Sequence, residues 1–228
     1  AHDGWAGLEK AKACAPKDIL SEVTASGLRG RGGAGFPAGI KWQTVADAAG
    51  PTKYIVCNAD EGDSGTFADR MIMEGDPFLL IEGMAIAGRA VGAGQGYIYV
   101  RSEYPHAIAK LNAAIERCAD LIAPFKVEVR VGAGSYVCGE ETSLLNSLEG
   151  KRGEVRAKPP LPAHEGLFGK PTVVNNVLTL CAVPFIMAHG AKAYEQFGMG
   201  RSRGTMPIQL AGNIKYGGLY ETAFGITL

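Results

Sequence analysis

The chain has 228 residues, of which 46% are hydrophobic and 20% charged, the composition of a globular protein with a sizeable core. Its 23 basic and 23 acidic side chains cancel, which excludes electrostatic capture by nucleic acid or an anionic membrane, and no apolar run is long enough to cross a bilayer. The five cysteines form no C-x-x-C pair, which favours a reducing, cytoplasmic compartment and argues against a metal or cluster site in this segment.

Helices alternating with short apolar strands predict an α/β fold. A helical stretch over residues 4–25 precedes a glycine-rich run. Strands are then expected at 53–57, 97–100 and 126–131, and helices at 77–91, 104–121 and 138–148. This alternation predicts right-handed crossovers and a parallel sheet. Beyond residue 205, two short strands flank Lys215–Gly218.

The segments that follow the predicted strands are candidates for a ligand site, because ligands of such sheets bind beyond the carboxyl ends of the strands. These segments are NADEGDSG (58–65), RSE (101–103) and GAGSYVCGEE (132–141). Two of them combine carboxylates with small residues. Carboxylates suit ribose hydroxyls or a ring N–H better than a bare phosphate.

The glycine run GRGGAGF (30–36) matches the dinucleotide pattern G-x-G-x-x-G, but its context does not. A helical segment precedes it, Pro37 follows it, and residues 49–52 hold no carboxylate. A flexible linker also fits poorly, because Phe36 and Trp42 are not linker residues. We expect a glycine-rich cradle, with Arg29, Arg31 and Lys41 beside backbone amides as an anion site of another design.

Four long motifs carry a resemblance to a known family. GLRGRGGAGFPAGIKW, NADEGDSGTFADR, GAGSYVCGEETSLLNSLEG and KPTVVNNVLTL occur in that order and resemble the flavin subunit of NADH dehydrogenases. This family includes the NADH-binding subunit of respiratory complex I and the diaphorase subunits of NAD-reducing hydrogenases and NAD-dependent formate dehydrogenases. The stretch VRAKPPLPAHEGLFGKPTVVNNVLTL resembles the formate dehydrogenase beta subunit most.

The resemblance implies a Rossmann-like parallel sheet that holds FMN and NAD(H) in one cavity. It also implies three units: a helical and glycine-rich segment (1–52), the FMN/NAD-binding domain (53–200), and the beginning of a ubiquitin-like domain of the SLBB type (201–228). The family's 4Fe–4S cluster would lie in a missing C-terminal part, since the chain is expected to be part of a longer polypeptide. No cysteine here is assigned to that cluster.

The resemblance also implies the residues of the FMN site. Glycines and the arginine of the run would pack their backbone against the flavin, and the acidic loops would bind its ring. The predicted FMN residues are Gly30, Arg31, Gly32, Gly33, Lys41, Asn58, Asp60, Glu61, Tyr136, Gly139, Glu140, Glu141, Asn175 and Asn176. For the asparagine pair, a helix N-cap before VLTL is an alternative role.

For NAD(H), the resemblance implies that Phe36 stacks on adenine and that Glu141 accepts from the adenosine ribose and disfavours a 2′-phosphate. Lys41 supplies positive charge, and Asp63 faces the nicotinamide half. Leu161 is expected beside adenine, where the family has an aromatic residue. A residue such as Glu141 in the first turn of a helix is also a common partner of the helix dipole.

The implied function is hydride transfer between NAD(H) and FMN, with single electrons passed to or from iron–sulfur centres. The expected partners are a thioredoxin-like 2Fe–2S subunit and an iron–sulfur-rich catalytic subunit of a molybdenum or tungsten formate dehydrogenase or of a hydrogenase. Complex I is a further alternative. A remnant scaffold without flavin, and a stand-alone dehydrogenase with a catalytic histidine, are the competing hypotheses; none of the four histidines falls in the acidic motifs.

Overall fold

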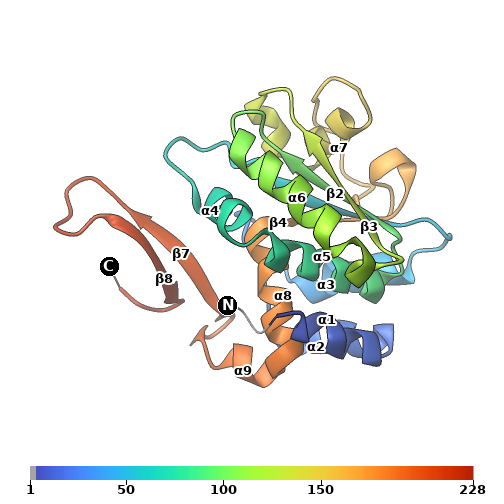
Figure 1. Cartoon of the computed structure of the whole chain (residues 1–228), viewed down its shortest axis with the longest axis horizontal. Helices are drawn as coiled ribbons and strands as arrows, with labels where there is room; N and C mark the ends of the chain where they lie inside the picture. The colour runs from blue at the N-terminus through green and yellow to red at the C-terminus, as the bar shows by residue number, and fades with distance from the viewer. Residues whose placement is uncertain (1–3, 228) are drawn as a thin grey trace.

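The computed structural model describes residues 4–227 and has a four-stranded parallel sheet at its centre, flanked by helices (Figure 1). The strands are β1 (Tyr54–Ala59), β2 (Gln95–Val100), β3 (Lys126–Val131) and β4 (Thr172–Asn176), in the spatial order β3-β2-β1-β4. The predicted α/β class and parallel sheet are confirmed. β4 was not predicted, because its five residues run directly into a helix with no turn signal between them.

The helices lie on both faces of the sheet because strand side chains alternate. Ile55 and Cys57 face the larger core, which is completed by α5 (Pro77–Val91), α6 (Pro105–Ile122) and α8 (Val177–His189). Val56 and Val174 face the other side, where Leu144 of α7 (Glu141–Leu148) and its neighbours form a smaller cluster. The two cores hold the sheet from both sides and leave its carboxyl edge to the loops.

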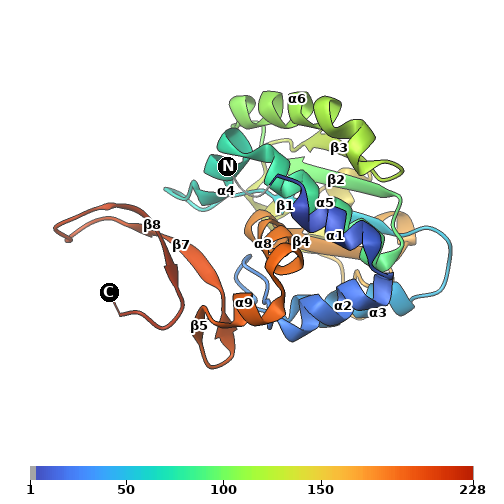
Figure 2. The same ribbon diagram turned by 60° about the horizontal axis from the view of Figure 1, so that its bottom comes forward.

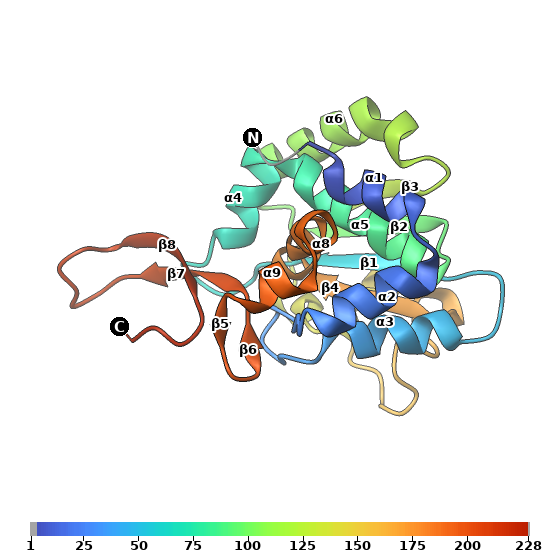
Figure 3. The same cartoon turned by 90° about the horizontal axis from the view of Figure 1, so that it is seen from below.

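The predicted N-terminal helical stretch is present and consists of two helices. α1 (Ala6–Ala13) and α2 (Pro16–Ala25) are separated at Cys14, whose extended backbone precedes the proline that opens α2. α1 packs against α5 and α8, and α2 packs against α5 and the unpredicted α3 (Ala38–Asp47) (Figure 3). The segment before the glycine run is therefore helical, as expected from its sequence.

Three further helical elements connect the strands and the site. α4 (Ala68–Gly75) follows the acidic loop, the 3-10 turn η1 (Tyr136–Gly139) precedes α7, and η2 (Leu167–Gly169) precedes β4. The helix predicted from residue 138 begins only at Glu141, because the backbone of Glu140 is extended and its side chain caps the helix. α9 (Ala191–Glu195) follows α8.

The C-terminal residues form two antiparallel ribbons outside the main sheet. The short pair is β5 (Gly198–Met199) with β6 (Ser202–Arg203), and the longer hairpin is β7 (Thr205–Leu210) with β8 (Gly218–Ala223). The two strands predicted around Lys215 are therefore present. Figures 1 and 2 show the β7–β8 hairpin projecting away from the helices and the sheet.

Among residues 4–227, no helix combines the length and hydropathy needed to cross a bilayer.

Close approach of α5 and α8 depends on Gly83, and this gives a first prediction. A Cβ at this position would overlap the carbonyl oxygen of Leu180. Gly83→Ala should therefore lower the free energy of unfolding by about 1–3 kcal/mol, as overpacked cores do. Urea unfolding followed by circular dichroism measures the change.

The matched control is Gly75→Ala in α4, where the added methyl meets no atom within 4 Å. Its effect should stay within about 1 kcal/mol, the size of the helix propensity term. Equal effects of the two substitutions would show that the α5–α8 contact does not limit stability.

Candidate functional site

The carboxyl edge of the sheet gathers most of the predicted site residues, and it does so around the β1–β4 pair. Asn58 lies opposite Asn176 in the parallel register, and Cys57 lies opposite Asn175. The chain leaves β1 towards β2 and β3 on one side and returns to β4 on the other, so the strand order reverses between β1 and β4. In sheets of this kind, ligands bind at such a switch point, between the segments that leave the two strands.

Asn175 and Asn176 alternate in direction and have different partners. Asn175 is buried, and its Oδ1 accepts from the indole Nε1 of Trp42 in α3 at 2.8 Å. Asn176 caps α8, since its Oδ1 accepts from the backbone N–H of Leu178 at 2.9 Å. The alternative N-cap role of this pair is confirmed for Asn176, and it leaves the exposed side of the residue towards the glycine run.

The glycine run forms a closed loop beside Asn176. Its base is held by the bond from Gly30 N–H to the carbonyl of Phe36 at 2.9 Å and by a β-bridge between Arg29 and Pro37. A Cβ on Gly32 would lie 3.4 Å from the Cβ of Asn176, so the backbone of the run passes close to the edge of the sheet. Gly33 has φ +105°, which favours glycine, and has open space around it.

The arginines of the run donate hydrogen bonds to other groups of the protein, and the anion site expected from Arg29, Arg31 and Lys41 stays a prediction. A guanidinium nitrogen of Arg29 donates to the carbonyl of Gly35 at 2.6 Å. The guanidinium of Arg31 donates to Tyr194 Oη at 2.9 Å and to the carbonyl of Arg203 at 2.7 Å. Both guanidinium groups make internal contacts, and the backbone N–H of Arg31 donates to Thr179 Oγ1 in the first turn of α8 at 2.9 Å.

The acidic loop after β1 is held by two of its own residues. Asn58 Nδ2 donates to the carbonyl of Gly139 at 2.8 Å, which joins this loop to η1. Glu61 is buried and caps α4, accepting from the backbone N–H groups of Asp69 and Arg70 at 2.9 and 3.1 Å. Arg101, which follows β2, donates to the carbonyl of Glu61. The glutamate is thus a structural anchor of the loop.

Asp60 is the residue whose environment calls for a ligand. Its Oδ2 is buried and has no hydrogen-bond partner among the described residues. Burial raises the pKa of this carboxyl to about 6, against the opposing charge of Arg101 and with the added repulsion of Glu103. A buried acceptor without a donor costs about 1–3 kcal/mol, which a bound group with an N–H or O–H would offset.

Glycine backbone and a tyrosine ring lie around Asp60. A Cβ on Gly139 would lie 3.5 Å from Asp60 Oδ2, and one on Gly62 would lie 2.9 Å from the ring of Tyr136. Tyr136 is 70% exposed and its hydroxyl donates to Asp63 Oδ1 at 2.6 Å. The donors of a flavin, its ring N–H and ribityl hydroxyls, match this unpaired carboxylate and glycine-lined backbone.

A second charged group lies at the start of α7. The carboxylate of Glu140 caps this helix, accepting from the N–H groups of Thr142 and Ser143 at 2.8 and 3.0 Å. Burial opposes ionisation, but hydrogen bonds from Lys158, Thr142 and these amides hold the pKa of Glu140 at about 2. Glu140 is therefore ionised at neutral pH and fixed in place.

Glu141 stands between two lysines. Lys158 Nζ lies 3.0 Å from one of its oxygens, and Lys41 Nζ lies 3.6 Å from the other. Lys41 also donates to the carbonyl of Val174 in β4 at 2.9 Å, which ties α3 to the sheet edge. Glu141 is the first residue of α7, as expected for a partner of the helix dipole. Its carboxylate is partly exposed and also forms an ion pair with Lys41 of α3.

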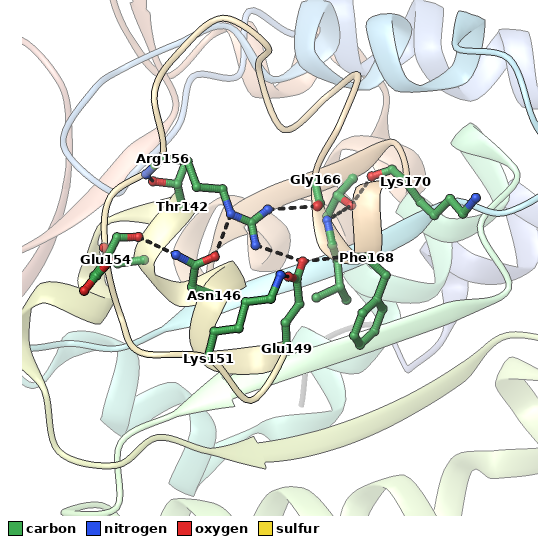
Figure 4. A network of polar contacts seen from close by, with 12 residues as sticks. Thr142, Asn146, Glu149, Lys151, Glu154, Arg156, Gly166, Phe168 and Lys170 are labelled. Carbon is green, nitrogen blue, oxygen red and sulfur yellow. Dashed lines mark hydrogen bonds and ion pairs between the residues drawn. The ribbon is translucent and has the colours of Figure 1, made fainter.

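Lys158 was not predicted, and the loop that carries it is fastened by Arg156 (Figure 4). Arg156 donates to Asn146 Oδ1 at 2.8 Å and to the carbonyl of Gly166 at 3.0 Å, and pairs with Glu149 at 2.8 Å. Figure 4 shows these groups converging on one guanidinium between α7 and the loop. In the sequence, a lone basic residue in a proline-rich loop carries no signal of this role.

Phe36 and Leu161, the residues predicted beside adenine, lie at the surface. Their side chains are 47% and 48% exposed, on the glycine run and on the loop after α7. Phe36 is therefore not a core residue. Cys57 and Cys138 are buried, and burial raises the pKa of the Cys57 thiol. Of the histidines, His2 lies outside the described residues.

A cavity of about 1120 Å³ lies away from the strand ends, and the predicted site residue Arg31 is among its lining residues. It lies between α4, α5 and α8 on one side and the β7–β8 hairpin on the other, with Met71, Phe78, Leu178 and Pro207 in its walls. We place the cofactor site at the strand ends because the unpaired carboxylate and the glycine-lined backbone occur there. No group of three or more histidine, cysteine or carboxylate residues within 4–227 is arranged to hold a metal ion.

A switch point in the strand order, beside an unpaired buried carboxylate and glycine-containing loops, defines an α/β cofactor-binding module suited to a flavin. The model of the Nuo51 FMN-binding domain matches residues 23–185, more than half of the chain. The chain belongs to this family, and FMN is the cofactor of the family. The resemblance inferred from the four motifs is confirmed at this level.

Similar proteins extend the comparison. The chain is 47% identical to the HndC subunit of an NADP-reducing hydrogenase from Solidesulfovibrio fructosivorans, covering 99% of this chain and 48% of the relative. It is 48% identical to a subunit of the NADH-quinone oxidoreductase of Aquifex aeolicus (strain VF5), covering 99% and 55%. The chain thus spans about half the length of these curated relatives.

A solved structure agrees with the fold. The crystal structure of an NAD+-reducing NiFe-hydrogenase in the air-oxidized state superposes with a TM-score of 0.94 at 43% identity. The match covers 99% of this chain and 40% of the hydrogenase chain. The fold class predicted from the sequence is the fold of that protein's matching part.

The buried pair of Asp69 and Asn176 gives a prediction for the pH dependence of stability. Asp69 Oδ2 accepts from Asn176 Nδ2 at 2.7 Å. Burial and then the charge of Glu61 raise the pKa of Asp69 to about 7, against the bond from Asn176. Below pH 4 both folded and unfolded chains hold this proton; between pH 4 and 7 the unfolded chain releases it first, so folding becomes less favourable.

Asp69→Asn removes this titration. The unfolding free energy of the variant, relative to the wild type, should therefore rise between pH 4 and 7, by at most about 1.4 kcal/mol per pH unit. Urea unfolding at several pH values measures the difference in unfolding free energy. Asp47→Asn, at an exposed position of α3, is the control for losing one carboxylate. A difference independent of pH would contradict a protonated Asp69.

Proposed function

We propose that this chain is the diaphorase part of an NAD-dependent oxidoreductase and transfers hydride between NAD(H) and FMN. The observation that carries the proposal is the buried, unpaired Asp60 carboxylate at the switch point, flanked by glycines of two loops. Family membership supports FMN, and the names of the similar hydrogenase and NADH-quinone oxidoreductase subunits support a nicotinamide partner.

The protein's part in the reaction is binding and orientation. FMN, when bound, supplies hydride exchange with the nicotinamide and single-electron exchange with iron–sulfur centres. Asp60 would accept from the flavin, and the backbone of Gly32 and Gly33 would approach it closely. Asn58 and Glu61 keep the acidic loop in place through the contacts described above. No nucleophile and no obligatory general base is required from the chain.

The nicotinamide nucleotide would lie towards the Glu141 side of the cradle. Phe36 and Leu161 are exposed apolar side chains available to adenine, and Asp63 is at the mouth of the acidic loop. Glu141 would accept from the adenosine ribose, with Lys158 and Lys41 fixing both of its oxygens. An ionised carboxylate there opposes a 2′-phosphate.

The context we propose is a cytoplasmic complex in which iron–sulfur subunits exchange electrons with this chain. The sequence stretch 155–180 supports a formate dehydrogenase, and the names of the similar proteins support a hydrogenase or complex I. The five free cysteines, all without disulfides, are consistent with a reducing compartment. NAD+ reduction by the purified complex with formate or with hydrogen distinguishes the donors.

The prediction for FMN concerns Asp60. Asp60→Ala should weaken FMN binding by about 10- to 100-fold, because a hydrogen bond to a charged acceptor contributes about 1.5–3 kcal/mol. Quenching of flavin fluorescence on titration measures the dissociation constant. Asp120→Ala, on the exposed side of α6, is the matched control and should bind FMN as the wild type does. A wild-type chain that takes up no FMN would refute the proposal.

The prediction for nucleotide choice concerns Glu141. The FMN-loaded chain should lose its 450-nm flavin absorbance (a general property of flavins) with NADH and much less with NADPH under anaerobic conditions. Glu141→Gln should reduce this preference by about tenfold, since a neutral amide no longer repels the 2′-phosphate. The NADPH measurement is needed because one similar protein is a subunit of an NADP-reducing hydrogenase. Equal bleaching of the wild type by both nucleotides would overturn the role of Glu141.

A further inference from the structure

The β7–β8 hairpin is joined to the rest of the molecule in a way that the cofactor site does not explain. A cavity of about 1120 Å³ separates much of the hairpin from α4, α5 and α8, and Pro207 and Leu219 line its hairpin side. Figures 1, 2 and 3 all show the hairpin standing beside the body instead of packing flat on it. Its position therefore depends on local contacts at its two ends.

One contact is made by Gln209, near the end of β7. The side-chain amide of Gln209 donates to the carbonyl of Gly65 at 2.7 Å and accepts from the backbone N–H of Phe67 at 2.9 Å. Both partners belong to the segment that leads from the acidic loop into α4. A single side chain thus satisfies a donor and an acceptor of that segment, across 144 residues of sequence.

The other contact is made by Arg31 of the glycine run, at the base of the hairpin. Its guanidinium donates to the carbonyl of Arg203, just before β7, and lies 4.7 Å above the ring of Phe224, just after β8. The carbonyl of Gly204 accepts from the backbone N–H of Phe224, which closes the base. One arginine therefore holds both ends of the hairpin to the glycine run.

The hairpin consequently bridges the two loops that form opposite walls of the proposed cofactor cradle. Its base is held by the glycine run and the end of β7 by the acidic loop, with a strand of six residues between them. Six extended residues span roughly 20 Å, and pairing with β8 stiffens them. Movement of the hairpin would therefore move one wall of the cradle relative to the other.

We propose that Gln209 is a positioning residue: through it, the C-terminal hairpin holds the acidic loop at the distance from the glycine run that FMN requires. Gln209 is not one of the proposed FMN residues and would act through Gly65 and Phe67. The inference rests on the proposed site, but its primary test needs no cofactor.

The experiment compares Gln209→Ala with Thr205→Ala. The control removes another polar contact of the same hairpin, the bond from Thr205 Oγ1 to Glu221 at 2.6 Å, and leaves both loops untouched. Hydrogen exchange of the cofactor-free chain is followed at residues 62–67 and, separately, at residues 31–36, which Gln209 does not contact. Fluorescence titration then gives the FMN dissociation constant of each variant.

The expected result is exchange about tenfold faster in both loops of Gln209→Ala, and FMN binding weaker by about tenfold, with neither change in Thr205→Ala. Faster exchange confined to Phe67 and its neighbours, together with FMN affinity within twofold of the wild type, would overturn the proposal. Hydrogen exchange could show that the hairpin itself opens in Gln209→Ala. In that case Gln209→Met is used in place of Gln209→Ala, because it keeps the length of the side chain and removes the amide; the same results support or overturn the proposal.

The two proposals fail in different ways. A wild-type chain that binds no FMN defeats the proposed function, while exchange at residues 31–36 still decides whether the hairpin connects the loops. A chain that binds FMN equally well with and without the Gln209 amide, and whose glycine run exchanges at an unchanged rate, defeats the positioning role alone.

Discussion

The parallel pairing of β1 with β4 is the contact on which the site depends. It places Asn58 opposite Asn176, and it creates the point at which the strand order reverses. The loop that leaves β1 and the helix α8 that follows β4 diverge there, so a ligand can lie between them without displacing the core. The acidic loop leaves β1 directly, the glycine run passes close to Asn176 at the end of β4, and the turn before α7 is joined to the acidic loop by the Asn58–Gly139 hydrogen bond.

Burying carboxylates around this edge costs folding free energy, and hydrogen bonds to these carboxylates offset most of that cost. Glu61 binds two amides at the start of α4, and Glu140 binds two at the start of α7, so each satisfies helix ends that would lack partners. Asp69 holds Asn176. Asp60 differs from these residues, since one of its oxygens is buried without a partner among the described residues. A group with donors that binds there offsets this remaining cost.

The sequence predicted the elements with strong local signals and missed those without. Pro77 and the apolar residues after it gave α5 with the bounds that the structure has, because a proline start and a glycine end are local features. β4 has only five residues and continues into α8, so neither alternation nor a turn marked it. The break between α1 and α2 was missed although Pro16 signals it.

The sequence predicted which residues belong to the candidate site better than it predicted how they are arranged. The motifs identified the family, and the FMN residues that we propose follow from that resemblance, while the competing helix-cap role of Asn176 was also foreseen. The roles of Arg31, Lys158 and Gln209 could not be read from the sequence, because each depends on a partner far away along the chain. For Gln209 the separation is 144 residues.

The sequence by itself determined the composition of the loops: glycines where backbone must approach a ligand, carboxylates where donors must be met, and prolines or caps where helices begin. These are properties of single residues and their immediate neighbours. Only the tertiary structure decided which carboxylate is left unpaired, which cations are used internally, and which loops are tied together. Those outcomes depend on burial and on distances between groups far apart in the chain, and neither quantity exists until the sheet has formed and β1 lies beside β4.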